Sequence, residues 1–186
     1  MLEQPMIEKL LAMRLQGMAD ALKAQQQDQT IHEASFLERL AMLVDQQWNW
    51  RENQALERRL KAAKLRGNTC VEDIDYRASR GLDKSVMRAL TQESSWVAKH
   101  ENIFVLGPTG IGKSYIAAAL AQKACRDGYS VLSTRAAALF RDLNLARADG
   151  SLRSLLGRLA RIDVLVIDDW AMAPFSEAEQ HILIEE

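Results

Sequence analysis

The sequence predicts an α/β fold with a parallel sheet over residues 96–186, preceded by an all-α domain over residues 1–95. Two observations predict this division. Apolar residues before residue 96 recur at the spacing of one helix face, whereas residues 103–106 and 164–167 are continuous apolar runs separated by helical patterns. Continuous apolar strands that alternate with helices are typical of a parallel sheet with both faces covered.

The composition is that of an ordinary globular chain, because 48% of the 186 residues are apolar and 26% are charged. The net charge of −1 excludes a global field that would draw the protein onto nucleic acid or membranes, so such contacts need a local patch. The first residues lack a signal-peptide pattern, and no apolar run approaches the roughly 18 residues of a membrane span. We therefore expect a cytoplasmic protein without membrane contact, in which Cys70 and Cys125 are reduced thiols.

The all-α domain is predicted to begin with one amphipathic helix over residues 2–27. The apolar stripe of this helix consists of Ile7, Leu11, Leu15, Met18 and Leu22. A second, long helix is predicted to start after the capping box of Ser35 and Glu38. We expect a kink near Trp48–Trp50 and an end at Gly67-Asn68. Thr69 with Glu72 offers another capping box, and Asp83 is expected to cap a helix over residues 84–95.

The α/β region is predicted to alternate strands and helices. In chain order, the predicted elements are a strand at 103–106, a helix at 115–126, a strand at 129–133, helices at 135–147 and 152–160, a strand at 164–167, and a final helix capped by Ser176 and Glu179.

The segment GPTGIGKS, residues 107–114, satisfies the P-loop pattern and stands between a predicted strand and a predicted helix. Glycines allow consecutive backbone N–H groups to point at phosphate oxygens, and the helix N-terminus adds positive potential. Lys113 would reach the β- and γ-phosphates of ATP, and the Ser114 hydroxyl would bind Mg²⁺. The alternative is a glycine turn before a core helix. The candidate nucleotide-binding residues are Gly107, Pro108, Thr109, Gly110, Ile111, Gly112, Lys113, Ser114 and Tyr115.

Two carboxylates follow the last predicted strand, and the carboxyl end of such a strand is where open α/β sheets bind ligands. Asp168 is suited to hold Mg²⁺ through water, and Asp169 to polarise the attacking water. Alternatively, the pair caps a turn. The candidate catalytic residues are thus Lys113, Asp168 and Asp169, and the candidate metal ligands are Ser114 and Asp168.

These motifs, together with Arg80-Gly81-Leu82-Asp83 and the segment Trp170–Pro174, resemble the IstB-like ATPases. That family comprises AAA+ proteins that assist insertion-sequence transposases, and it is close to the DnaC-type helicase loaders. The resemblance covers essentially the whole chain. It implies a homo-oligomeric ATPase that uses ATP and Mg²⁺ and binds double-stranded DNA and a cognate transposase.

The sequence departs from the family pattern at two places. Ala171 stands where the family usually has glycine. The family also continues beyond the position of Glu186, with further strands, a polar sensor residue and an arginine that completes a neighbour's site. The resemblance therefore implies an AAA+ sheet that is incomplete at the C-terminus, with unpaired edges between residues 103–106 and 164–167. We expect such a chain to hydrolyse ATP weakly or not at all.

Two basic clusters are candidate DNA contacts, because Lys and Arg neutralise backbone phosphates. The first is Arg58, Arg59, Lys61, Lys64 and Arg66. The second is represented by Arg147 and Arg153, on either side of a predicted turn at which related ATPases present DNA-contacting loops. A solvated helix end is the alternative interpretation of the first cluster, since cations are favoured at a helix C-terminus.

Three functions fit these features. The first is a DNA-binding AAA+ ATPase that assists or regulates transposition of an insertion sequence with its transposase. The others are a DnaC-like helicase-loader ATPase and a truncated, non-hydrolysing nucleotide-binding remnant of a mobile-element gene. Asp169 in place of glutamate, followed by Trp170, favours the first function over the helicase loader.

Overall fold

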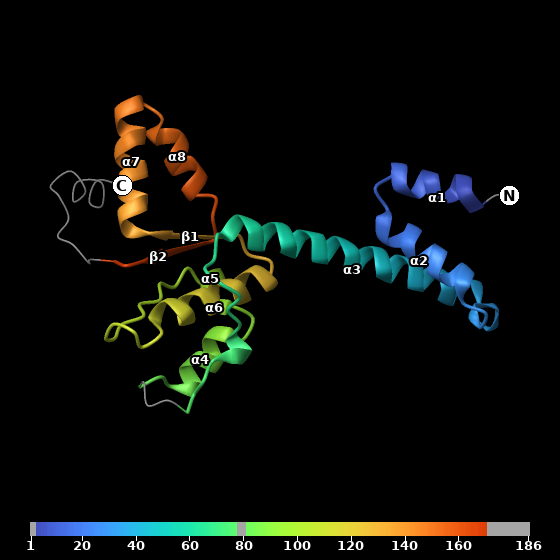
Figure 1. The fold of residues 1–186 in the computed structure, drawn as a ribbon, viewed down its shortest axis with the longest axis horizontal. Helices are drawn as coiled ribbons and strands as arrows, with labels where there is room; N and C mark the ends of the chain where they lie inside the picture. Colours follow the sequence, from blue (N-terminus) through green and yellow to red (C-terminus); the bar gives the residue numbers. More distant parts are fainter. Residues whose placement is uncertain (1–2, 78–80, 171–186) are drawn as a thin grey trace. The chain divides into compact units, whose positions relative to one another are not determined.

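The computed structural model describes residues 3–77 and 81–170 of the chain (Figure 1). The chain divides into two compact units, Met1–Arg58 and Arg59–Glu186, and the division falls inside one long helix. The predicted final helix after Ser176 lies outside the described residues.

The described secondary structure of the first unit is helical. Its elements are α1 (Glu3–Ala12), α2 (Gln16–Gln27), the short 3-10 helix η1 (Ile31–Glu33) and most of α3 (Phe36–Ala63). The prediction of one helix over residues 2–27 is wrong, because Arg14 adopts a left-handed conformation with φ of 60°. The N–H of Leu15 then donates to the carbonyl of Leu10 at 2.8 Å, which closes α1 in the manner of a Schellman turn.

Helix α2 runs antiparallel along α3 at close range. Near the start of α2, the backbone N–H of Met18 donates to Gln47 Oε1 at 3.2 Å. Near its end, the Gln25 amide donates to the carbonyl of Arg39 at 2.9 Å. Both glutamines are buried, and these bonds satisfy the Gln25 amide nitrogen and Gln47 Oε1, whereas Gln47 Nε2 is buried without a hydrogen bond.

The predicted capping box at the start of α3 is confirmed. The Ser35 N–H donates to the Glu38 carboxylate at 2.7 Å, and the Glu38 N–H donates to Ser35 Oγ at 3.3 Å. The hydroxyl and N–H of Ser35 hold the pKa of Glu38 below its usual value. Helix α3 is assigned without interruption through Trp48–Trp50. It ends at Ala63, before the predicted Gly67-Asn68, because Lys64 takes the left-handed conformation with φ of 53°.

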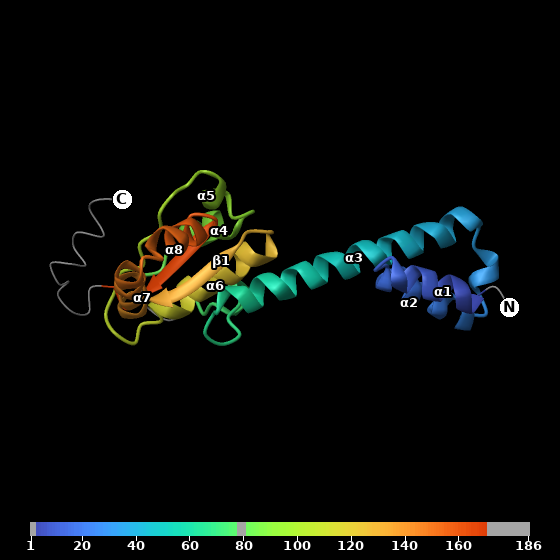
Figure 2. The ribbon, with the colours of Figure 1, turned by 90° about the horizontal axis from the view of Figure 1, so that it is seen from above.

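The second unit contains a parallel pair of strands and most of the remaining helices. In chain order its elements are η2 (Val71–Asp73), α4 (Lys84–Thr91), α5 (Ser95–Ala98), α6 (Lys113–Arg126), β1 (Val131–Arg135), α7 (Ala136–Asp149), α8 (Leu152–Leu159) and β2 (Val164–Asp168). Strands β1 and β2 are parallel and in register from Val131 opposite Val164 to Arg135 opposite Asp168. Helix α6 packs against both strands, and α7 and α8 form a hairpin on the other side of them (Figures 1 and 2).

One predicted strand is not formed. Residues 103–106 have no strand assignment, and within the described chain the only sheet is the pair β1–β2. Ile103 and Val105 are half-buried, but Phe104 and Leu106 are 83% and 87% exposed. A strand needs a neighbour to receive its ladder hydrogen bonds, and no strand in the described residues pairs with this segment.

Two helix starts before the P-loop differ in outcome. Asp83 caps α4 as predicted, accepting the Ser85 N–H at 2.7 Å, and this interaction lowers the pKa of its carboxyl group. The helix ends at Thr91, four residues earlier than expected. The capping box of Thr69 and Glu72 does not form. Thr69 Oγ1 is buried without a hydrogen bond, and the chain makes the 3-10 helix η2 instead.

The core of the second unit joins the segment before the P-loop to α6. Its buried residues are Ile74, Met87, Ile116, Ala119 and Leu120. Because residues on η2 and α4 pack against α6, the compact unit extends back to Arg59 and does not begin at the expected boundary of residues 95 and 96. The assignment of regions 1–95 and 96–186 to partner binding and ATP hydrolysis stays a prediction.

Candidate nucleotide-binding site

The P-loop has the backbone geometry of a phosphate cradle. Residues 107–112 lead into α6, with Gly112 at its N-cap. Gly110 and Gly112 have φ of 81° and 100°, which side-chain-bearing residues rarely adopt. A β carbon on Gly107 would lie 3.2 Å from Ile111 Cγ2. These glycines therefore allow a tight loop that ends at the positive N-terminus of a helix, an arrangement that favours anions.

The Lys113 side chain folds back over this loop. Its Nζ donates to the carbonyl of Gly107 at 2.8 Å and to the carbonyl of Pro108 at 2.9 Å. The ammonium group is thus held at the mouth of the loop. Phosphate oxygens would offer it stronger, charged acceptors than these two carbonyls.

Ser114 and Asp168 meet although they are far apart in the sequence. Ser114 Oγ donates to Asp168 Oδ1 at 2.9 Å, which joins the first turn of α6 to the carboxyl end of β2. The same carboxylate oxygen accepts the backbone N–H of Asp169 at 3.0 Å. The structure therefore brings together the two motifs that sequence reasoning combined into one site.

Ser114 and Asp168 offer the kind of donors that Mg²⁺ prefers. Mg²⁺ binds oxygen ligands and usually keeps several water molecules. A hydroxyl and a carboxylate oxygen meet here at hydrogen-bond distance, 2.9 Å, so one ion could be held by Ser114 Oγ and by Asp168 through water. Phosphate oxygens and water usually supply the other ligands at nucleotide sites, so a pair of protein oxygens fits this ion.

Asp169 occupies a constrained position directly after β2. Its φ of 56° is left-handed, and its carboxylate lies 3.4 Å from Arg135 Nε at the end of β1. The ring of the next residue, Trp170, lies 6.0 Å from the buried ring of Phe140 on α7. The position of Asp169 is therefore set by two contacts, its own ion pair with Arg135 and the ring contact of Trp170 with Phe140. Its carboxylate is half-exposed, which leaves it accessible to water.

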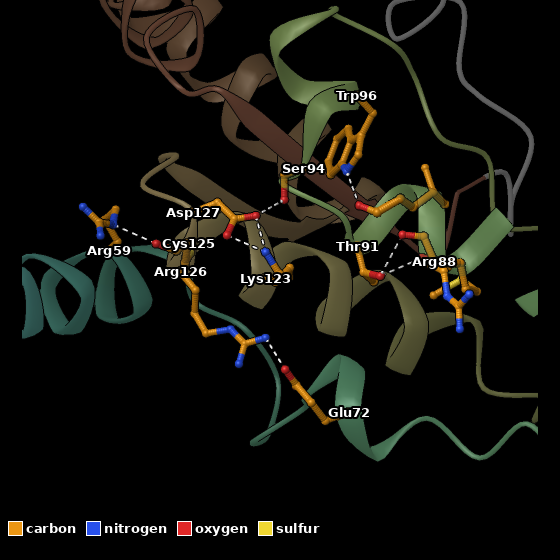
Figure 3. A network of polar contacts seen from close by, with 12 residues as sticks. Arg59, Glu72, Arg88, Thr91, Ser94, Trp96, Lys123, Cys125, Arg126 and Asp127 are labelled. Atoms are coloured by element: carbon orange, nitrogen blue, oxygen red, sulfur yellow. Dashed lines mark hydrogen bonds and ion pairs between the residues drawn. The ribbon is translucent and has the colours of Figure 1, made fainter. Parts of the chain in front are cut away.

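Arg66 is the residue of this site that sequence reasoning placed elsewhere. Its Nη1 lies 3.8 Å from Asp168 Oδ2, whereas the basic cluster in the sequence predicts it as a DNA contact. Nothing in the local pattern indicates this neighbour, since the two residues meet only through the packing of the connector after α3 against α6. Arg59 also has an intramolecular partner: its Nε donates to the carbonyl of Cys125 at 2.9 Å (Figure 3). Arg58, Lys61 and Lys64 of the same cluster are exposed.

A polar network holds the C-terminal end of α6 against the segment before the P-loop (Figure 3). Arg126 pairs with Glu72 at 2.6 Å, and this pairing lowers the pKa of Glu72. Asp127 pairs with Lys123 and accepts the hydroxyl of the fully buried Ser94 at 2.7 Å. The network fixes the helix whose other end forms the phosphate cradle.

The second pair of predicted DNA contacts lies on the α7–α8 hairpin. Arg147 is in the last turn of α7 and Arg153 in the first turn of α8, and both are exposed. Gly150, with φ of 79°, makes the turn between them. Both arginines are thus presented near one tip of the hairpin.

Over residues 3–77 and 81–170, none of the helices combines the length and apolar character that crossing a bilayer requires.

Comparisons with known proteins extend over the whole chain. The family model described as IstB-like ATP binding protein matches residues 8–185. A protein of Sinorhizobium fredii (strain NBRC 101917 / NGR234) named as an insertion sequence ATP-binding protein is 40% identical over 185 residues, which cover 100% of this chain and 75% of that protein. A protein of Pseudomonas fluorescens named as an ATP-binding protein of the insertion sequence IS1162 is 41% identical over 186 residues, covering 100% and 80%. A protein of Pseudomonas aeruginosa named as an ATP-binding protein of the insertion sequence IS21 is 33% identical over 147 residues, covering 79% and 55%.

Proposed function

Because the chain belongs to the family of IstB-like ATP binding proteins, we propose that it is an ATP-binding, DNA-binding AAA+ ATPase that assists or regulates transposition of an insertion sequence. The observation that carries the nucleotide part is the contact of Ser114 Oγ with Asp168 Oδ1 at 2.9 Å, which unites the P-loop with the acidic end of β2. The proposed partners are double-stranded DNA, a cognate transposase and further copies of the chain. The proposed location is the cytoplasm.

Binding of ATP would use the loop, the helix and Lys113 together. Backbone N–H groups of residues 107–112 and the N-terminus of α6 would surround the phosphates. Lys113 would exchange its bonds to the carbonyls of Gly107 and Pro108 for oxygens of the β- and γ-phosphates. Ser114 and Asp168 would hold Mg²⁺, which neutralises the charge that develops on the phosphates.

Asp169 is suited to orient the water that attacks the γ-phosphate. Its carboxylate is half-exposed, and Arg135 fixes its direction from the end of β1. A carboxylate that accepts a proton or a hydrogen bond from the attacking water is the usual arrangement for this chemistry. In this proposal Lys113 stabilises charge, Asp168 places the metal, and Asp169 positions the nucleophile.

A titration with a fluorescent ATP analogue and Mg²⁺ tests the nucleotide site. Lys113→Ala removes a charged hydrogen-bond donor, so its affinity should fall by at least about tenfold. Lys99→Ala is the matched control, because Lys99 is an exposed lysine outside the loop. Ser114→Ala should raise the Mg²⁺ concentration needed for tight binding. Equal affinities of Lys113→Ala and the parent chain would refute the site.

DNA binding is proposed to use the exposed residues of both basic clusters. Arg58, Lys61 and Lys64 are exposed on and just after α3, and Arg147 and Arg153 flank the turn of the α7–α8 hairpin. Arg59 and Arg66 have partners within the chain, so we expect them to contribute less. The proposed contacts are electrostatic and therefore largely independent of DNA sequence.

The salt dependence of DNA affinity tests this part. Each lost phosphate contact should lower the slope of log affinity against log salt concentration by about 0.9 on duplex DNA. Lys61→Ala with Lys64→Ala should flatten the slope, whereas Lys9→Ala with Lys23→Ala removes the same charge from exposed positions of α1 and α2 and should not. Equal slopes for the two double variants would identify the first cluster as a solvated helix end.

A further inference from the structure

Arg66 shares the carboxylate of Asp168 with the P-loop serine. Asp168 Oδ1 accepts the Ser114 hydroxyl at 2.9 Å, and Arg66 Nη1 lies 3.8 Å from Oδ2 of the same group. Arg66 is therefore a third cationic group at the proposed nucleotide site, beside Lys113 and Arg135. Its side chain is 55% exposed, and a guanidinium carries five N–H donors, so donors remain for another acceptor.

The connector that carries Arg66 is anchored on both sides of this residue. Ala63 is fully buried before it, and Thr69 is buried after it. The carbonyl of the next residue, Cys70, accepts the hydroxyl of Tyr115 in the first turn of α6 at 3.5 Å. The turn that carries Arg66 is thus held against α6, the helix that follows the P-loop. This contact places the arginine near the site.

Binding of Mg²⁺ and ATP would change the balance of charge around Asp168. A divalent cation between Ser114 and Asp168 competes with the Arg66 guanidinium for the same carboxylate and repels it. The γ-phosphate of a bound ATP would bring new negative oxygens to this edge of the sheet. A guanidinium forms bidentate bonds to phosphate, so the phosphate is a better partner than a carboxylate already engaged by metal.

Resting on the proposed function, we propose that Arg66 moves from Asp168 to the γ-phosphate when Mg²⁺ and ATP bind, and so distinguishes ATP from ADP. With ADP, no γ-phosphate is present, so Arg66 has no γ-phosphate oxygen to bind and adds nothing to the affinity. Because Arg66 follows the end of α3 by three residues, this exchange also makes the connector after α3 respond to the state of the nucleotide.

Titrations of the full chain with fluorescent ATP and ADP, each with Mg²⁺, test this proposal. Arg66→Ala should lower the affinity for ATP by about tenfold, the lower end of the range for a bond to a charged group, and leave the affinity for ADP nearly unchanged. Arg66→Lys, which keeps the charge but loses the planar fork, should restore part of the preference for ATP. Arg51→Ala, which removes an exposed arginine of α3 outside both basic clusters, is the matched control and should bind both nucleotides as the parent does.

The outcomes separate this proposal from the one on which it rests. If the parent chain binds neither nucleotide, or if Lys113→Ala binds as the parent does, the proposed ATP site fails. If the parent binds ATP through Lys113 but Arg66→Ala keeps the same ratio of ATP to ADP affinity, the role of Arg66 is overturned. An unchanged ratio with a flatter salt dependence of DNA binding would assign Arg66 to DNA instead. Circular dichroism of each variant shows whether it folds.

Discussion

Replacement of Gly17 by alanine should destabilise the first unit, because α2 and α3 approach each other closely at this residue. A β carbon at position 17 would lie 2.7 Å from the carbonyl oxygen of Gln46, 2.8 Å from Gln47 Cα and 2.8 Å from Trp50 Cβ. Two of these atoms belong to the backbone of α3, so a rotamer change cannot relieve the overlap. The helices must separate.

Two opposing effects set the size of the change. Alanine in a helix interior is better than glycine by about 0.5–1 kcal/mol. Overpacking in a well-packed contact costs about 1–3 kcal/mol. The contact is with backbone on a buried face, so we expect the second effect to win and the free energy of unfolding to fall by about 1–2 kcal/mol. Gly157 in α8 has nothing within 4 Å of its would-be β carbon, so Gly157→Ala should gain about 0.5–1 kcal/mol.

Urea unfolding followed by far-UV circular dichroism and by tryptophan fluorescence measures both variants. Trp48 and Trp50 report on the first unit and Trp96 and Trp170 on the second, so the fluorescence can show two transitions, which matters because two units need not unfold together. The expected result is a lower midpoint for Gly17→Ala and a higher one for Gly157→Ala. A midpoint for Gly17→Ala at or above that of the parent would show that the helices do not pack at the distance described.

Two other predictions concern an ionised group and the thiols. Asp163 accepts the N–H and the hydroxyl of Ser130, each at 2.7 Å, and the hydroxyl is the main cause of its lowered pKa. A carboxyl group with a lowered pKa stabilises the fold above its unfolded pKa of about 3.9 and loses this effect as the pH falls through the folded value. Asp163→Asn should therefore lower stability near neutral pH by about 1 kcal/mol, and the difference should shrink below about pH 4; a constant difference in urea midpoints would contradict this. Cys125 is fully buried and burial raises the pKa of its thiol, whereas Cys70 is partly exposed, so a thiol reagent should modify Cys70 in the folded chain and Cys125 only on unfolding. Equal labelling rates under native conditions would disprove the burial of Cys125.

Sequence reasoning succeeded where a local signal determines the structure. The glycines of the P-loop require positive φ, and α6 begins directly after Gly112. Short-range side-chain bonds likewise fixed the starts of α3 and α4 at Ser35 and Asp83. The apolar run 164–167 predicted β2, which has β1 beside it to receive its ladder hydrogen bonds, whereas the similar run 103–106 has no strand beside it among the described residues.

The failures concern conformations and contacts that tertiary packing decides. Arg14 and Lys64 adopt left-handed conformations that end α1 and α3, although neither residue type signals a helix end. The apolar stripe of residues 2–27 continues across the break at Arg14, so periodicity cannot show it. Arg66 meets Asp168 only because the connector after α3 folds back toward β2. In the sequence, Arg66 stands in a basic cluster, which predicts an exposed DNA contact instead.

The segment of residues 103–106 has a consequence for how the protein behaves in concentrated solution. Phe104 and Leu106 are almost fully exposed and alternate with half-buried residues, and residues 102–106 carry no charge. Extended, apolar and uncharged segments with unpaired backbone groups are templates for pairing with another chain. Within the described chain no strand occupies this edge, so purified protein should aggregate increasingly with concentration, and Phe104→Thr with Leu106→Thr should raise its solubility. Light scattering measured against concentration would show whether the parent chain aggregates more than the double variant does.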